Sequence, residues 1–204
     1  SGGLHGVGAS VVNALSTELT VQVEREGKIH VQKFERGVPK GELQILGDSD
    51  RTGTTITFKP DGEIFTETLV YDYDILAVRL RELAFLNRGI KITIRDDRED
   101  GKSNEYHYEG GIKSYVEYLL EGIKKESLTN EVIYLSGTKG DSTAEIALLW
   151  STAYDNKILS FANTLHTIDG GTHEQAFRQT VTRVVNKYAH DFKKIKDSAD
   201  NLKG

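Results

Sequence analysis

The chain has 204 residues, of which 37% are hydrophobic and 28% are charged, and this balance predicts a globular chain with one large or two small cores. Its 26 Lys and Arg residues against 31 Asp and Glu residues give a formal net charge of −5 and a pI near 5.7. Nucleic-acid binding through bulk positive charge is thereby excluded, so any DNA contact must be local. Cysteine is absent, which excludes disulfides, thiolate nucleophiles and cysteine metal sites.

The sequence also bears on location and completeness. It contains no apolar run near the roughly 20 residues that span a bilayer, and it does not open with a charged and then apolar leader. We therefore expect a cytoplasmic protein that is neither inserted in a membrane nor secreted, which the absence of cysteine also fits. Methionine is absent too, and the chain opens at Ser1 inside a glycine-rich loop, so we expect an internal piece of a longer protein.

The first third of the chain predicts one short helix and a group of strands. The helix is expected over residues 9–16, and residues 19–25 and 29–34 alternate apolar and polar side chains as half-buried strands do. Because a tight turn joins these two strands, they predict an antiparallel hairpin and not a parallel crossover. Further strands are expected at 43–46 and 54–58, after a segment rich in glycine.

The middle of the chain predicts a second helix and a second hairpin. Within residues 72–87 leucines recur at helical spacing, acidic residues occupy the first turn, and Gly89 lies just past the end. Strands are expected at 90–95 and 105–108 on either side of a charged turn. The carboxylates in these segments, Asp72, Asp74, Asp96 and Asp97, stand where helix caps and turns need them, so we expect structural roles for them.

Gly110-Gly111 marks the expected boundary between two domains, residues 1–109 and 110–204. An amphipathic helix begins at Ile112. Strands are then expected at 131–135, 143–150 and 157–161. A last long helix is expected from Thr172, which forms a capping box with Gln175. Its apolar stripe comprises Phe177, Val181, Val184, Val185 and Tyr188.

The densest chemical signal lies at the start, where Ser1-Gly2-Gly3-Leu4-His5-Gly6-Val7-Gly8-Ala9-Ser10 runs into a helix. Its four glycines let backbone N–H groups converge on one point, and a helix N-terminus adds partial positive charge. Both features suit an anion such as a polyphosphate. A flexible loop that leads into a helix cap stays open as the alternative, and an exposed loop histidine is the favoured interpretation of His5 from spacing alone.

Two other nucleotide folds compete for this loop. The lysine-containing P-loop is excluded, because no Gly-Lys-Ser/Thr follows the glycines. A dinucleotide fold stays open, because Gly6-x-Gly8 opens a helix and Glu24 or Glu26 ends a strand about 20 residues later. However, Val11 occupies the third glycine position, and the following strand turns straight into a hairpin, so this fold is disfavoured.

Histidines and basic residues near the end of the chain have weaker signals. Their positions are His166, His173 and His190, and Arg178, Arg183 and Lys187. The histidine spacing matches no set of ligands on one helix face, so we predict no metal site built by this chain. The three cations lie away from the apolar stripe of the last helix, where they form either a solvated face or a face for DNA.

Six blocks of the sequence resemble, in order, the DNA gyrase B family of bacterial type II topoisomerases. They are SGGLHGVGASVVNALS, REGKIHVQKFERGVP, RTGTTITFKPD, RLRELAFLNRGIKI, YHYEGGIKSYVEYL and SFANTLHTIDGGTHEQAFRQTVTRVVN. The resemblance covers essentially the whole chain. An ordered run of motifs is far more specific than one glycine loop.

The resemblance implies an α+β fold and a set of site residues. Residues 1–109 would be the later part of a GHKL-type ATP-binding domain, a two-layer sandwich, and residues 110–204 the start of a transducer domain with a βαβ-like S5 fold. It implies that Thr54 lies beside adenine, that Arg25 lies at the pocket mouth near where aminocoumarin inhibitors bind, and that Arg178 faces a cavity that DNA traverses. The implied triphosphate cradle is Gly3, Leu4, His5, Gly6, Val7, Gly8, Ala9 and Ser10, with His5 at the terminal phosphate.

The resemblance also implies a parent enzyme, an ATP-dependent type II topoisomerase that supercoils DNA negatively. Its implied cofactors are ATP and Mg²⁺, and its implied partners are DNA, the gyrase A protein and a second copy of the gyrase B protein. The family's catalytic glutamate, its Mg²⁺-binding asparagine, its adenine-reading aspartate and its Gln-x-Lys loop match no block of this chain. We therefore expect this chain alone to be inactive. The alternatives are the corresponding ATPase protein of topoisomerase IV and a nucleotide-regulated binding module outside the topoisomerases.

Overall fold

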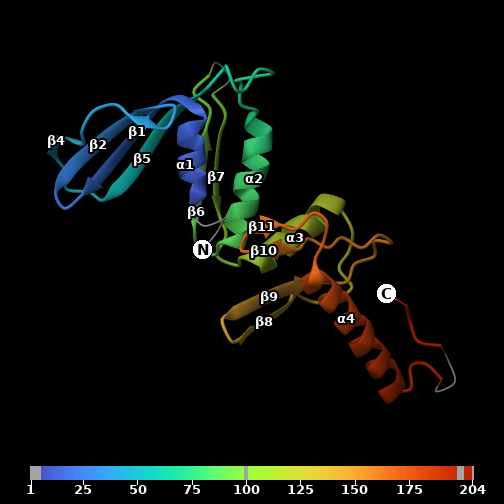
Figure 1. Ribbon diagram of the computed structural model, residues 1–204. Helices are drawn as coiled ribbons and strands as arrows, with labels where there is room; N and C mark the ends of the chain where they lie inside the picture. The colour runs from blue at the N-terminus through green and yellow to red at the C-terminus, as the bar shows by residue number, and fades with distance from the viewer. Residues whose placement is uncertain (1–5, 99–100, 197–199, 204) are drawn as a thin grey trace. The chain divides into compact units, whose positions relative to one another are not determined.

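The computed structural model describes residues 6–98, 101–196 and 200–203, which form two compact units of helices and antiparallel sheets. Among the described residues, the first unit comprises 6–78, 96–98 and 101–102, and the second comprises the rest. Helix α2 (Tyr73–Leu86) contributes to both (Figure 1). The α+β class expected from the sequence is confirmed, while the domain boundary at residue 110 stays a prediction.

The first unit is built on one antiparallel sheet in the order β3-β2-β1-β5, with β4 also paired to β2 (Figure 1). Its strands are β1 (Ser16–Arg25), β2 (Lys28–Glu35), β3 (Val38–Pro39), β4 (Gln44–Asp48) and β5 (Gly53–Pro60). The hairpin prediction is confirmed, because β1 and β2 pair antiparallel up to Arg25 opposite Lys28. Gly27 at the turn has a φ of 77°, which favours glycine. The short strand β3 was not predicted.

The helix α1 (Val7–Ala14) packs against β1, β2 and β5. A helix was expected at 9–16, so the observed helix begins and ends two residues earlier than predicted. The reason is local: Ser16 already begins β1 and is buried, with its hydroxyl donating to the carbonyl of Val12 at 2.6 Å. That bond closes the last turn of the helix with a side chain.

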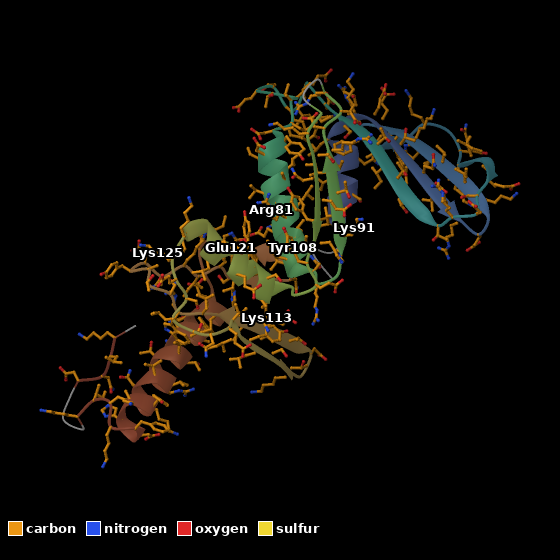
Figure 2. The ribbon with its side chains drawn as sticks, turned by 180° about the vertical axis from the view of Figure 1, so that it is seen from behind. Arg81, Lys91, Tyr108, Lys113, Glu121 and Lys125 are labelled. Atoms are coloured by element: carbon orange, nitrogen blue, oxygen red, sulfur yellow. The ribbon has the colours of Figure 1, made fainter. Side chains whose placement is uncertain are left out.

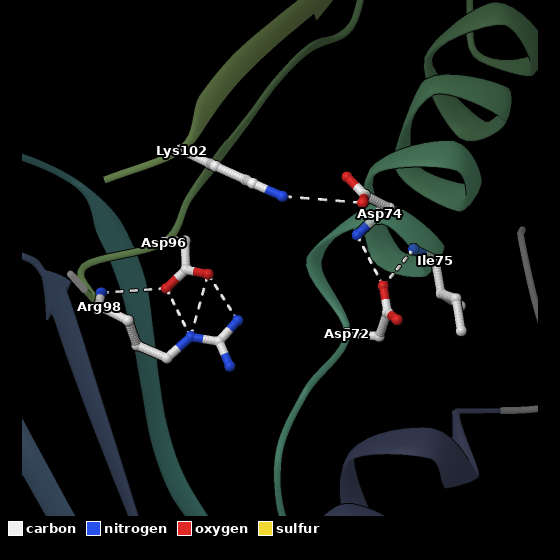
Figure 3. A network of polar contacts seen from close by, with 6 residues as sticks. All are labelled: Asp72, Asp74, Ile75, Asp96, Arg98 and Lys102. Atoms are coloured by element: carbon white, nitrogen blue, oxygen red, sulfur yellow. Dashed lines mark hydrogen bonds and ion pairs between the residues drawn. The ribbon is translucent and has the colours of Figure 1, made fainter. Parts of the chain in front are cut away.

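Carboxylates cap α2 and close the turn that follows strand β6 (Lys91–Arg95) (Figure 3). Asp72 Oδ1 accepts the N–H groups of Asp74 at 2.9 Å and Ile75 at 3.0 Å, so its predicted capping role is confirmed. Asp96 accepts from the Arg98 side chain and backbone, which lowers the pKa of Asp96 to about 2. These acids have structural partners among their neighbours.

The second unit holds three two-stranded antiparallel sheets and the longest helix. Its elements are the C-terminal part of α2, β6 with β7 (Ser103–His107), α3 (Ile112–Ile123), β8 (Ile133–Lys139) with β9 (Ser142–Leu148), β10 (Phe161–Ala162) with β11 (Leu165–His166), and α4 (Thr172–Asp191). The expected strand at 157–161 is wrong, since residues 157–160 lie outside any strand. Among the described residues no strand pairs with 157–160, and of the expected strand only Phe161, in β10, is paired.

Aromatic side chains form the core of the second unit. Phe85 is only 1% exposed, and its ring stacks on Tyr108 with centroids 3.6 Å apart and on Tyr115 at 4.7 Å. The guanidinium of Arg81 lies 5.1 Å from the centre of the Tyr106 ring, a cation–π arrangement. Figure 2 shows Arg81 on α2 and Tyr108 after β7. Packing of α2 on the β6–β7 hairpin and α3 therefore depends on Phe85.

The predicted apolar stripe of α4 is not buried among the described residues. Val184 is 56% exposed and Tyr188 is 54% exposed, whereas the buried residues of this helix are Asn186 and Ala189. The side-chain amide of Asn186 donates to the carbonyl of Leu202 at 3.0 Å and accepts its N–H at 2.7 Å. This polar pairing with residue 202 buries Asn186, which is not a member of the predicted stripe.

We expect Phe85→Ala to lower the free energy of unfolding by about 3–5 kcal/mol, because it removes a buried ring and leaves a cavity between two tyrosines. Urea unfolding followed by circular dichroism measures this change. Tyr154→Ala is the matched control, because Tyr154 is fully exposed and its loss should stay within about 0.5 kcal/mol. Equal losses for the two variants would contradict the assignment of Phe85 to the core.

Candidate functional site

The first turn of α1 presents open backbone N–H groups. Gly6 is its N-cap in a left-handed conformation, with a φ of 75°, and no side chain of the described residues caps the helix. Residues 6–10 are exposed, and the first turn contains no acidic side chain. An uncapped helix start carries partial positive charge and suits an anion. Of the predicted cradle, Gly6, Val7, Gly8, Ala9 and Ser10 lie here, whereas Gly3, Leu4 and His5 lie outside the described residues.

A buried ion pair fixes the other end of α1. The Asp61 side chain is 2% exposed, and it lies 2.6 Å from Arg36 Nε while accepting the N–H of Glu63 at 2.9 Å. That N–H, and then the Arg36 guanidinium, hold the pKa of Asp61 below its usual value. The backbone N–H of Asp61 donates to Leu15 at 3.0 Å, and that of Arg36 to Ser16 at 3.0 Å. The junction between α1 and β1 is therefore held from two sides.

Thr54 and Arg25 lie toward the same end of the sheet, where β1 ends. Thr54 on β5 pairs with Val23 on β1, and Arg25 is the last residue of β1. The Arg25 guanidinium lies 3.0 Å from Glu26, and both side chains are exposed. Between these two residues and the first turn of α1, the described part of the chain has no hydrogen bond or ion pair. Their meeting in one nucleotide pocket stays a prediction.

Sequence reasoning missed a polar cluster beside Arg25. Glu24 accepts the Ser49 hydroxyl at 2.6 Å, and Arg51 Nε lies 3.5 Å away. The hydroxyl bond, followed by the charge of Arg51, lowers the pKa of Glu24. This cluster joins β1 to the loop between β4 and β5. No short-range pattern reveals it, because Glu24 lies 25 or more positions from its partners Ser49 and Arg51.

The N-terminus of α4 differs from the expected capping box. Gly171 is the N-cap and no side chain caps the helix, so Thr172 and Gln175 do not form the box. Gly170 has a φ of 74°, and a Cβ at Gly171 would lie 2.7 Å from the His173 ring. Two consecutive glycines thus leave room for the side chains of the first turn. The predicted capping is wrong because Thr172 is already the first residue of the helix and Gly171 occupies the N-cap position.

Glu174 connects the turn before α4 to the predicted DNA-facing residue Arg178. Its Oε2 accepts the Ser160 hydroxyl at 2.7 Å, and its Oε1 accepts Arg178 Nε at 2.9 Å and lies 2.9 Å from Nη2. The Ser160 bond and then Arg178 lower the pKa of Glu174. The Arg178 side chain is 48% exposed and that of Glu174 is 17% exposed. The spacing of four residues was a visible signal for this pair.

Between Glu174 and Asp191, α4 carries cations and no acid. From Gln175 to His190 the sequence has Arg178, Arg183 and Lys187 and no Asp or Glu. Both Arg183 and Lys187 are exposed. A local excess of cations therefore exists on a chain whose formal net charge is −5. The predicted DNA contact of Arg178 itself stays a prediction.

The second unit also contains a cavity of about 440 Å³ beside the N-terminus of α3. Its lining includes the cations Arg88 and Lys113 and the carboxylates Glu117 and Glu145. The formal charges of these four groups cancel, so the cavity favours neither an anion nor a cation. Figure 2 labels Lys113 at the start of α3.

The described residues contain neither a candidate metal-ligand cluster nor a helix that could span a membrane. Over residues 6–98, 101–196 and 200–203, no group of three or more His, Asp and Glu side chains is placed to hold a metal ion. The expectation that this chain builds no metal site stays a prediction. In the same residues, no helix has both the length and the apolar character needed to cross a membrane.

Comparisons with known proteins point to one family. A family model described as DNA gyrase B matches residues 111–204. The chain is 56% identical over its whole length to the DNA gyrase B protein of Bacillus mycoides, covering 50% of that protein. It is also 56% identical to the protein of the same name from Halalkalibacterium halodurans, covering 32% of it. With the DNA gyrase B protein of Streptococcus pneumoniae the identity is 53%, over 31% of that protein.

The fold agrees with the sequences. The structure is similar to the 43K ATPase domain of Thermus thermophilus gyrase B, solved in complex with an aminocoumarin. The TM-score is 0.82 at 39% identity, and the match covers 98% of this chain and 54% of that chain. Over its whole length the chain is similar to DNA gyrase B proteins. It spans half or less of the length of these relatives.

We expect the Asp61–Arg36 pair to stabilise the first unit in a pH-dependent way. The folded pKa of Asp61 lies below the ordinary 3.8, so its stabilisation is complete above about pH 4 and is lost as pH falls through the lowered folded pKa. The excess unfolding free energy of the wild type over Asp61→Asn should be constant from about pH 5 to 8 and shrink below about pH 4.

Urea unfolding of both proteins at a series of pH values measures this difference. Asp50→Asn is the charge-matched control, because Asp50 is exposed in a loop, and this substitution should leave stability near that of the wild type. A difference that grows as the pH falls would show that Asp61 is not stabilised as a carboxylate.

Proposed function

We propose that this chain is the phosphate-binding and clamp portion of the gyrase B protein of DNA gyrase, a type II topoisomerase. In this proposal, ATP closes a dimeric gate around a DNA duplex, and strand passage introduces negative supercoils. The observation that carries the proposal is the 56% identity to a DNA gyrase B protein over the entire chain. The structural similarity to a gyrase B ATPase domain, with a TM-score of 0.82, supports it.

The role in ATP binding is supported by the shape and charge of the start of α1. Exposed N–H groups without an acidic neighbour fit a triphosphate, which the glycine-rich residues ahead of α1 and Gly6 to Ser10 would wrap. Thr54 would lie beside the adenine and Arg25 at the mouth of the pocket. Bound ATP supplies the phosphoanhydride bond whose cleavage resets the gate. Mg²⁺ and the attacking water would be held by residues outside these 204.

The role in DNA handling is supported by α4. Its cations are exposed and its sequence from residue 175 to 190 contains no acid, so it offers a duplex a local positive surface despite the negative net charge. We assign residues 1–109 to the ATP-binding domain and 110–204 to the transducer domain. The proposed partners are the gyrase A protein, a second copy of the gyrase B protein and DNA, in the cytoplasm.

The ATPase protein of topoisomerase IV is the alternative within the same class, and the names of the relatives disfavour it. The test uses the full-length protein reconstituted with its gyrase A partner. Gyrase should convert relaxed plasmid into negatively supercoiled plasmid when ATP is added. Decatenation of linked circles without supercoiling would favour topoisomerase IV, and nucleotide binding without either reaction would favour a nucleotide-regulated binding module.

We expect Gly8→Ala to have opposite effects on the helix and on the reaction. Gly8 lies inside α1, and nothing lies within 4 Å of the position of an added Cβ, so alanine should favour the helix by about 1 kcal/mol. The same methyl group would project where backbone must approach phosphate closely, which should lower ATP turnover at least about tenfold. Steady-state ATPase assays of the full-length protein measure this turnover. Unchanged turnover would contradict the proposed role of Gly8 in the phosphate cradle.

The 204-residue chain by itself should not hydrolyse ATP, because positioned phosphates without a group to activate water lack an essential part of the reaction. A coupled assay for released ADP with Mg²⁺ present measures this, with the full-length protein as the positive control. Mg²⁺-dependent turnover that copurifies with the chain and is abolished by Gly8→Ala would overturn the expectation.

A further inference from the structure

We propose that Glu174 is an internal counter-ion of Arg178 that a DNA phosphate has to displace, so that a duplex is held at this point weakly and reversibly. The inference rests on the proposed contact between Arg178 and DNA. It goes beyond that contact by assigning Glu174 the role of setting its strength. Glu174 would touch neither DNA nor nucleotide, and it acts through Arg178 alone.

The geometry places the carboxylate on one edge of the guanidinium. Glu174 Oε1 accepts Arg178 Nε at 2.9 Å and lies 2.9 Å from Nη2. A guanidinium carries five N–H donors, and the edge formed by Nε and Nη2 is one of those that bind a phosphate with two parallel bonds. While Glu174 occupies that edge, a phosphate must either displace the carboxylate or bind the remaining N–H donors of the guanidinium. The negative charge of the carboxylate also weakens the attraction of Arg178 for phosphate.

Glu174 stays in place when Arg178 turns away, because a separate contact holds it. Its other oxygen, Oε2, accepts the hydroxyl of Ser160 at 2.7 Å, and Ser160 is 9% exposed. The carbonyl of Ser160 in turn accepts the N–H of Thr167 at 2.8 Å and its hydroxyl at 2.9 Å. The carboxylate is thus anchored to the segment around β10 and β11, not only to the arginine it neutralises.

Exposure of the two side chains fits an exchange of partners. Arg178 is 48% exposed while Glu174 is 17% exposed, so the guanidinium reaches solvent and the carboxylate lies mostly beneath it. An ion pair with one exposed member contributes little to stability, so a phosphate can replace the carboxylate without a large penalty. An arginine without this counter-ion would hold phosphate more tightly and release a passing duplex more slowly.

The test measures binding of a fluorescently labelled duplex to the full-length gyrase B protein by anisotropy over a range of salt concentrations. The variants are Glu174→Gln, Arg178→Gln, the double variant, and Ser160→Ala. Glu121→Gln is the charge-matched control, since Glu121 is an exposed residue of α3 in the same unit (Figure 2). Glutamine keeps the size of Glu174 and removes its charge; it retains one accepting oxygen and replaces the other with an amide N–H donor.

Glu174→Gln should raise duplex affinity roughly two- to fivefold at low salt beyond the effect of Glu121→Gln, the range expected for loss of a half-exposed pair. Arg178→Gln should weaken binding and reduce the slope of log K against log salt by about 0.9, the value of one phosphate contact. In the Arg178→Gln background, Glu174→Gln should add nothing beyond the control. Ser160→Ala should not raise affinity, because it leaves the carboxylate charge in place.

The outcomes separate the inference from the proposed function. If Arg178→Gln changes neither affinity nor salt slope, the DNA contact of Arg178 fails and the counter-ion role fails with it. If Arg178→Gln weakens binding but Glu174→Gln weakens it too, Glu174 supports the arginine and the counter-ion role is overturned. If Ser160→Ala raises duplex affinity as much as Glu174→Gln does, the increase comes from loosening of the start of α4. That result would also overturn the counter-ion role.

Discussion

The Asp61 carboxylate is the constraint on which the first unit depends. It is 2% exposed, and a charge so far from water persists only when charge and hydrogen bonds compensate it. Arg36 supplies the charge and the N–H of Glu63 supplies the hydrogen bond. The backbone N–H groups of Asp61 and Arg36 then reach Leu15 and Ser16. One buried side chain therefore joins the end of β5, the end of β2 and the junction between α1 and β1.

This anchoring leaves the two ends of α1 in different conditions. The C-terminal end is tied to the sheet, whereas the first turn is exposed and has no side-chain cap. Unpaired N–H groups at a helix start are ordinarily satisfied by a capping side chain or by water. Here the sequence places glycines where Ser, Thr, Asp or Asn would cap. A helix held at one end and left uncapped at the other can offer its N–H groups to a ligand without being displaced.

Local patterns in the sequence predicted the hairpins and the helices, because a period of two or of 3.6 residues and a tight turn lie within a few neighbouring positions. They failed where a long-range partner decides. Residues 157–161 were expected to form a strand, but among the described residues no strand pairs with residues 157–160. Thr172 and Gln175 had the spacing of a capping box, but Gly171 became the N-cap. In the first case the expected segment has no partner strand, and in the second the predicted N-cap residue lies inside the helix.

The same distinction applies to the candidate site. The glycine-rich start and the cations of α4 are visible in the sequence, as is the Glu174–Arg178 spacing. The pairing of Asp61 with Arg36 and of Glu174 with Ser160 spans 25 and 14 positions, so only the fold brings these groups together. Net charge also fails to predict where an anion binds. The formal charge of −5 describes the whole chain, whereas a phosphate responds to charges within about 10 Å. In the proposed DNA contact, a phosphate at α4 would meet Arg178 and the carboxylate beside it, so the strength of that contact would follow from the pair and not from the net charge of the chain.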